Sequence, residues 1–318
     1  MSTNTNQMPQ DFNSLIEVIE YFTDEKKCLD YLMAQRFDGA IACPHCGGSK
    51  VYCFSDGIRF KCGSCRQQFT AKVGTIFEGS KIPMKKWFTA IYLVTSHKKG
   101  ISSHQLARDI KVTQKTGWFM LHRIRFALGQ GSFDMPLGGE GVIVESDTTI
   151  TGGKVKNMSN KKRKEIREGF RGINDNKASV AGYIERSGTI KFDVIAPNES
   201  EKELLTKHVD TTSVLMTDSA TTYTTVGKEF AHHGIVDHSK SEYVRDNVYH
   251  TNTIEGAFSL FDRMIIGIYH SVSVKHLQAY CNESAYRYNT RKMNEGNRVS
   301  LTVQKSNGRL TYKALISK

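Results

Sequence analysis

Four of the seven cysteines fall into two pairs whose spacing is typical of metal-binding knuckles. Two residues separate Cys43 from Cys46 and Cys62 from Cys65, and fifteen residues lie between the pairs. Two such pairs supply four thiolates for a tetrahedral Zn²⁺ ion, and their clustering argues against four unrelated buried cysteines. Because four thiolates leave no open coordination position for a substrate, the sequence predicts a structural zinc site.

Three acidic residues in the second half of the chain adjoin apolar segments. Asp147 follows the apolar segment 141–145, and Asp218 follows the segment 213–217. Glu255 lies beside the apolar stripe of a predicted helix. Carboxylates at the ends of two core strands and on a helix packed against them can hold two Mg²⁺ ions about 4 Å apart, an arrangement that catalyses phosphoryl transfer. By spacing alone this signal is weak, and solvated surface carboxylates are the alternative that the spacing favours.

The chain carries 44 Lys and Arg residues against 32 Asp and Glu residues, a formal net charge of +12. Such an excess favours polyanionic partners, because each neutralised phosphate releases condensed counterions. Between residues 154 and 171, eight basic residues accompany two acidic ones. We interpret this run as a mobile loop that binds DNA, and a solvated charged loop is the alternative. Its candidate DNA contacts are Lys161, Lys162, Arg163 and Lys164.

The segment 101–128 has the pattern of a helix-turn-helix. Ser102 or Ser103 caps a first short helix, a break follows at 111–113, and apolar residues then recur at helical spacing. The second helix carries the basic side chains that we expect to contact DNA. An ordinary helical hairpin with a solvated basic face is the alternative. The candidate contacts are Lys115, Arg123 and Arg125.

The pattern predicts a mixed α/β chain of several domains, in which small DNA-reading modules precede a strand-rich domain. The expected parts are an N-terminal helical segment at 1–40, a zinc ribbon at 41–72, a helix-turn-helix region at 80–129, a mixed-sheet domain at 138–292 and a polar C-terminal tail at 293–318. No stretch approaches about 18 uninterrupted apolar residues, and the first dozen residues lack an apolar signal-peptide core. We therefore expect a cytoplasmic protein.

Several stretches, taken together in their order and spacing, resemble the IS1595 family of transposases, with its ISXO2-like DDE domain. The resemblance runs from about residue 13 to residue 291. The stretches that carry it are YLMAQRFDGAIACPHCGG, KIPMKKWFTAIYLVTSHKKGISSHQLARDI, VESDTTITGGK, MTDSATTY, HSKSEYVRDNVYHTNTIEGAFSLF and YRYNTR. The family implies a zinc ribbon and a helix-turn-helix that read terminal inverted repeats, followed by an RNase H-like domain that cleaves and joins DNA.

The resemblance also implies roles for individual residues. It matches the catalytic carboxylates to Asp147, Asp218 and Glu255. Asn252, one helical turn before the glutamate, is a rival or auxiliary site residue. His238 and His250 are implied as contacts of the scissile phosphate, and structural hydrogen-bonding histidines are the alternative.

The sequence departs from the family pattern at three places. Thr148 stands where an acidic residue usually follows the first aspartate, and Ile150 stands where an aromatic residue is usual. After the glutamate, where a Trp and a Lys-Arg pair are expected, Asp262 reverses the charge. Arg263, a candidate DNA contact, or the downstream Arg287 and Arg291 would compensate.

The sequence thus predicts a DDE-type transposase that binds double-stranded DNA through a nucleoid-associated homodimer or larger assembly. It would use Mg²⁺ or Mn²⁺ for strand cleavage and transfer and a structural Zn²⁺ for folding. One alternative is a catalytically impaired or domesticated transposase that acts as a sequence-specific DNA-binding protein. A second is an RNase H-like nuclease that cuts nucleic acid and never joins it.

Overall fold

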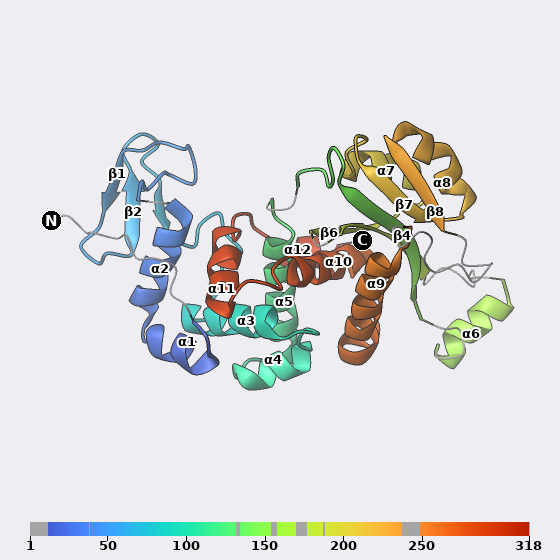
Figure 1. Cartoon of the computed structure of the whole chain (residues 1–318). Coiled ribbons are helices and arrows are strands. Elements are labelled where there is room, and N and C mark those ends of the chain that lie inside the picture. Colours follow the sequence, from blue (N-terminus) through green and yellow to red (C-terminus); the bar gives the residue numbers. More distant parts are fainter. Residues whose placement is uncertain are drawn as a thin grey trace. The chain divides into compact units, whose positions relative to one another are not determined.

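The chain divides into two compact units (Figure 1). The first contains residues 1–130 and 292–318, and the second contains residues 131–291. The computed structural model describes residues 12–37, 39–131, 134–153, 158–169, 177–186, 188–236 and 249–317. In this part of the chain, no helix is both long and apolar enough to cross a membrane.

A three-stranded antiparallel sheet forms the zinc ribbon of the first unit. Its strands, in spatial order, are β1 (Val51–Cys53), β2 (Arg59–Cys62) and β3 (Gln68–Thr70). Side chains alternate along β2, so Phe60 and Cys62 are buried while their neighbours are exposed. Phe60 stacks on Phe69 of β3 within a small core. Met33 of the helix α2 (Glu25–Phe37) packs against this core.

The remaining helices that precede residue 130 pack into a separate helical core. The two expected helices at 101–128 are present, and the hydroxyls of Ser102 and Thr113 cap their N-termini by accepting backbone N–H groups. Lys111 has a φ of 50°, which closes the turn between the two helices. The four helices of this core that precede residue 130 are α1 (Leu15–Tyr21), α3 (Met84–Ser96), α4 (Ser103–Asp109) and α5 (Gln114–Leu128), and the two expected helices are α4 and α5.

The C-terminal segment, expected to be a polar tail, instead forms two helices of the first unit. These are α11 (Glu295–Gln304) and α12 (Tyr312–Ile316). Val299 and Val303 of α11 are fully buried, and the Tyr31 hydroxyl lies 2.7 Å from the Ser300 hydroxyl. The expectation was wrong because two valines in a mostly polar stretch give a weak periodic signal, although they fill a core made by distant residues.

The second unit contains a five-stranded mixed sheet in the order β6-β5-β4-β7-β8. The pairs β4–β5 and β5–β6 are antiparallel, whereas β7 runs parallel to β4 and β8 runs parallel to β7. The strands are β4 (Ile143–Gly152), β5 (Lys177–Glu185), β6 (Ile190–Val194), β7 (Val214–Asp218) and β8 (His232–Val236). The apolar segments 141–145 and 213–217 overlap β4 and β7.

Helices cover both faces of this sheet (Figure 1). On one face, the aromatic side chains of α9 (Asn252–Met264) pack on β5 and β6 together with α10 (Val274–Asn289). On the other, Leu204 and Leu205 of α7 (Glu201–His208) join Tyr223 of α8 (Thr221–Val226). The sheet is therefore buried on both sides, and its polar groups meet solvent at the strand ends.

The basic run lies in the connection between β4 and β5. Where a loop was expected, the described residues 158–169 contain a helix, α6 (Asn160–Arg167), with no buried residue. The Ser159 hydroxyl caps this helix by accepting the Lys162 N–H. β4 and β5 pair with each other as far as Gly152 and Lys177. This two-stranded part extends beyond the residues of β4 that pair with β7 and those of β5 that pair with β6. This extension carries the basic helix away from the sheet (Figure 1).

We expect the double substitution Val299→Ala/Val303→Ala to lower the free energy of unfolding of the first unit by about 2 kcal/mol per site, because each removes buried methyl groups. Both tryptophans of the chain, Trp87 and Trp118, lie in this unit. Urea unfolding followed by tryptophan fluorescence therefore measures it. Ile316→Ala, at a side chain that is 51% exposed, is the matched control. Unchanged stability in the double variant would show that α11 does not contribute to the core.

Candidate active site and metal centre

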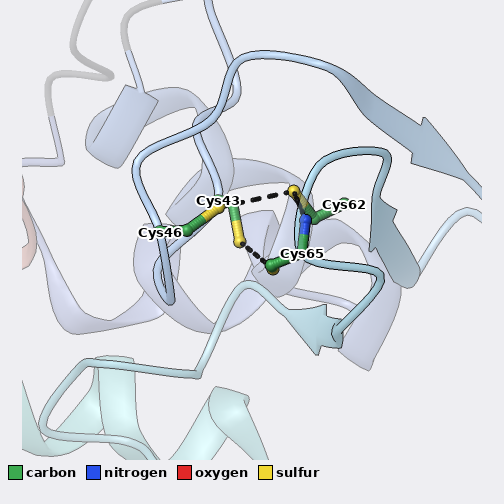
Figure 2. A group of neighbouring side chains, drawn as sticks. All are labelled: Cys43, Cys46, Cys62 and Cys65. Carbon is green, nitrogen blue, oxygen red and sulfur yellow. Dashed lines mark hydrogen bonds between the residues drawn. The ribbon is translucent and has the colours of Figure 1, made fainter.

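The four knuckle cysteines converge on one point of the ribbon (Figure 2). The Sγ atoms of Cys43 and Cys65 lie 3.6 Å apart, as do those of Cys46 and Cys62. Zn–S bonds of about 2.3 Å in a tetrahedron place sulfur atoms about 3.8 Å apart, so the spacing fits Zn²⁺. The Cys65 backbone N–H donates to the Cys62 Sγ and lowers the pKa of the Cys62 thiol to about 6, which favours the thiolate that binds zinc. The four cysteines thus form a cluster that fits the predicted structural Zn²⁺.

Asp147 and Asp218 lie at the same level on neighbouring parallel strands. Glu145 of β4 is in register with Met216 of β7, and each aspartate follows two residues later. Both side chains are half-buried. Asp218 is the last residue of β7, whereas Asp147 lies inside β4, which continues to Gly152. The expectation that both aspartates end their strands is therefore wrong for Asp147, because β4 extends beyond its apolar segment by pairing with β5.

Glu255 reaches the same place from the first turn of α9. The strand residue paired with Asp147 is Gly182, and a Cβ atom there would lie 2.8 Å from the side chains of Ile254 and Phe258. The missing side chain lets α9 pack closely on the sheet beside Asp147. The Thr251 hydroxyl donates to Glu255 at 3.0 Å, which orients the carboxylate.

The electrostatics of Asp147 reflect this arrangement. Burial is the main cause that raises the pKa of Asp147 to about 6, and the carboxylates of Asp218, Glu255 and Glu201 raise it further. A hydrogen bond from the Thr148 N–H, at 2.7 Å, acts in the opposite direction. Within the described residues, only the zinc-knuckle cysteines form a group whose potential ligand atoms all lie within 4.8 Å of one another. The carboxylates thus interact without closing to that distance.

A buried carboxylate that the sequence analysis did not select, Glu145, fixes the start of α9. It accepts hydrogen bonds from the backbone N–H groups of Thr253 and Ile254, at 2.8 and 3.0 Å, and from the Thr253 hydroxyl. Arg186 donates to it at 2.7 Å and also to the carbonyl oxygen of His250. Glu145 is fully buried. Its signal in the sequence was a charged residue directly after three apolar residues, 142–144.

A second unselected group, Glu201, lies beside Asp147. Both Thr148 and Tyr223 donate hydroxyl hydrogen bonds to Glu201, which begins α7. Burial is the main cause that raises the pKa of Tyr223, and Glu201 adds to it. Thr148 thus contacts a carboxylate from another element at the position where the family usually has an acidic residue of its own. No local pattern in the sequence indicates this contact.

The other residues implied by the family resemblance are placed differently from one another. His250 Nδ1 lies 3.2 Å from the Glu145 carboxylate, outside hydrogen-bond geometry, so this side chain faces an internal partner. Asn252 is exposed at the start of α9, and Arg263 is exposed in its last turn. His238 lies outside the described residues.

Two predicted DNA contacts are buried. Arg123 is 6% exposed and donates to the carbonyl oxygens of Ile76 and Leu310, and Arg125 is 1% exposed. Both side chains therefore lie in the core of the first unit, and the prediction that they contact DNA is not supported. The aliphatic stem of an arginine packs well beside apolar neighbours, so a basic helix position did not ensure exposure.

The remaining predicted contacts are accessible. Lys115 is exposed, with its ammonium 5.0 Å from the centre of the Tyr312 ring. The four basic residues selected in α6, Lys161, Lys162, Arg163 and Lys164, are all exposed.

Comparison with known proteins adds independent findings. Residues 136–289 match the family model of the ISXO2-like transposase domain (IS1595), and residues 23–68 match that of the transposase zinc-ribbon domain. An uncharacterized protein in transposable element ISH50 of Halobacterium salinarum (strain ATCC 700922 / JCM 11081 / NRC-1) is 30% identical over 113 residues. That match covers 35% of this chain and 38% of the relative. No solved structure matches the chain.

We expect Glu145→Gln to lower the stability of the second unit by about 3 kcal/mol, because it leaves the Arg186 charge without its partner and breaks the bonds to α9. Calorimetry of the full chain measures this transition, and tryptophan fluorescence should stay unchanged because both tryptophans lie in the first unit. Glu140→Gln, at an exposed position, is the matched control. Equal stability of the two variants would contradict the role of Glu145.

We expect Asp147→Asn to stabilise the second unit at about pH 7.5 without divalent cations. The folded-state pKa of Asp147 is about 6, above the unfolded value of about 3.9, so folding favours the protonated form. Ionisation therefore destabilises the fold increasingly between about pH 4 and 6 and stays costly above that range. Removing the charge should add about 1 kcal/mol after solvent screening, and the gain should vanish below about pH 4. Calorimetry across pH tests this, and a gain independent of pH would contradict it.

Proposed function

Because the chain belongs to the IS1595 family of transposases, we propose that it is a DDE-type enzyme that binds the ends of an insertion element and cleaves and joins DNA strands. The observation that carries this proposal is that Asp218, on the strand beside that of Asp147, and Glu255, in the first turn of α9, both lie near enough to raise the pKa of Asp147. The mixed five-stranded sheet, covered by helices on both faces, supports the RNase H-like fold that the family implies.

The three carboxylates would hold Mg²⁺ or Mn²⁺, since hard divalent cations bind carboxylate oxygens. Bound there, the ions supply charge neutralisation and lower the pKa of an attacking water or 3′-hydroxyl. The Thr148 N–H binds one oxygen of Asp147, which leaves the other available as a ligand. Thr251 orients Glu255 in the same way. Asn252, exposed one turn earlier, is the rival third ligand.

The DNA would contact basic side chains in both units. The exposed residues of α6 lie on the connection that follows the Asp147 strand, where they can bind phosphates close to the reacting strand. Lys115, Arg263 and His238 remain proposed contacts of the DNA. The His250 side chain instead faces the Glu145 carboxylate. Because two element ends must be brought together, we propose that a homodimer or larger assembly acts on DNA.

One observation favours a second function, that of a DNA-binding protein with impaired catalysis. Asp262 is exposed two helical turns after Glu255, where it repels the DNA backbone. The strand-joining assay decides between the two functions.

We expect Asp147→Ala and Asp218→Ala each to reduce strand transfer by about a thousandfold or more, because residues that act as one catalytic unit fail together. The assay uses a labelled duplex that carries the element's own end, with Mg²⁺ or Mn²⁺, and measures joined product. Binding of the same duplex should be unchanged, and Glu140→Ala is the control for activity.

The same assay assigns the third ligand. Loss with Glu255→Ala alone supports Glu255, and loss with Asn252→Ala alone moves the ligand to Asn252. Tight binding of the element end by the wild-type chain without any joined product favours the DNA-binding alternative. Nicked DNA without joining indicates a nuclease.

A further inference from the structure

Glu201 is the first residue of α7, but it does not cap this helix. Ser200 and Glu203 form the capping box: the Ser200 hydroxyl accepts the Glu203 N–H at 3.2 Å, and the Glu203 carboxylate accepts the Ser200 N–H at 3.1 Å. The Glu201 carboxylate instead receives hydrogen bonds from β4 and from α8. Its place at the start of α7 is therefore not explained by local helix stability.

Two hydroxyl groups hold one oxygen of the Glu201 carboxylate. The Tyr223 hydroxyl donates to Oε1 at 2.5 Å, and the Thr148 hydroxyl donates to the same atom. Tyr223 is 2% exposed, so the core around its ring fixes the position of this donor. Among the described residues, no donor bonds the Oε2 atom, so one oxygen is oriented and the other is available.

The negative charge of Glu201 meets no cation among the described side chains. Both of its donors are neutral hydroxyls, and the neighbouring Lys202 ammonium lies 2.5 Å from Glu229 instead. The buried Glu145 of the same unit, in contrast, is paired with Arg186. A half-buried carboxylate without a protein cation favours a cation from solution.

Thr148 connects Glu201 to Asp147. Its hydroxyl donates to Glu201 Oε1, and its backbone N–H donates to Asp147 Oδ1 at 2.7 Å. A single residue thus binds one oxygen of each carboxylate. The two carboxylates also interact directly, because Glu201 is among the acidic groups that, after burial, raise the pKa of Asp147.

We propose that Glu201 is a positioning residue of the active site, which acts through Thr148 on Asp147 and supplies the negative charge that the family usually has at position 148. The inference rests on the proposed function, because the group that this charge favours is the divalent cation at Asp147. The threonine is then one half of a pair: its hydroxyl holds a carboxylate of α7 beside the place where the family has an acidic side chain of its own.

The test measures Mn²⁺ binding by the zinc-loaded full chain without DNA, so that catalysis plays no part. Isothermal titration calorimetry gives the affinity, and scanning calorimetry verifies that the second unit of each variant is folded. Glu201→Gln keeps an oxygen that accepts both hydroxyls and removes the charge. Glu203→Gln, the matched control, removes a charge from the same helical turn and keeps the capping box, in which Gln also serves. Thr148→Glu/Glu201→Gln moves the carboxylate to the family's position.

We expect Glu201→Gln to weaken Mn²⁺ binding about tenfold, since removing a group that supports a metal ligand has an effect of this size. Glu203→Gln should bind like the wild type. The double variant should regain most of the lost affinity, a rescue that a purely structural role of Glu201 would not produce.

Wild-type affinity in Glu201→Gln, an equal loss in Glu203→Gln, or a double variant that regains nothing overturns the proposal. Asp147→Ala distinguishes this failure from that of the proposed function. Mn²⁺ binding that Asp147→Ala abolishes and Glu201→Gln leaves intact overturns only the role of Glu201, whereas a wild-type chain that binds no Mn²⁺ overturns both. The expected affinities in a chain that joins no strands support Glu201 and refute only the catalytic proposal.

Discussion

The second unit depends on one buried negative charge. A carboxylate without solvent is costly, so the fold must surround Glu145 with donors, and it does so with two backbone N–H groups of α9, the Thr253 hydroxyl and Arg186. Those donors can meet Glu145 only if α9 begins beside the central strand. The strand carries Asp147 two residues later, and the helix carries Glu255 in its first turn. The hydrogen bonds to Glu145 thereby hold β4 and α9 together, and these two elements carry Asp147 and Glu255.

The carboxylates near Asp147 are arranged against their own mutual repulsion. Burial and three neighbouring acidic groups oppose ionisation of Asp147, while a single backbone N–H favours it. Thr148 and Tyr223 donate to Glu201 and thereby keep this fourth carboxylate oriented. Such a cluster of carboxylates lowers the stability of the fold, and in the function that we propose this cost is exchanged for affinity toward cations.

Features set by residues close together in the sequence were predictable, whereas features set by distant residues were not. The cysteine knuckles were predictable because ligand spacing and turn geometry lie within a few residues, and the strands β4 and β7 because a short apolar segment marks each of them. Glu201 could not be selected, because its partner Thr148 belongs to a distant strand.

Burial of charged groups was the other limit. Arg123 looked like a surface cation, yet its donors are used by carbonyl oxygens from the segments around Ile76 and Leu310. A helical period describes which residues share a face, but it does not say whether a neighbour will cover that face. The same holds for α11, whose two buried valines meet a core assembled from the opposite end of the chain.

The return of the C-terminal helices to the first unit has a consequence for the order of synthesis. The whole second unit is inserted between two parts of the first, so the ribosome makes residues 131–291 before it makes α11. Until then, Tyr31 lacks its Ser300 partner and the core lacks Val299 and Val303. A product truncated within the second unit would therefore carry the early helices in an incomplete core and be a target for proteolysis. Completion of the helical core of the first unit thus follows synthesis of the whole second unit.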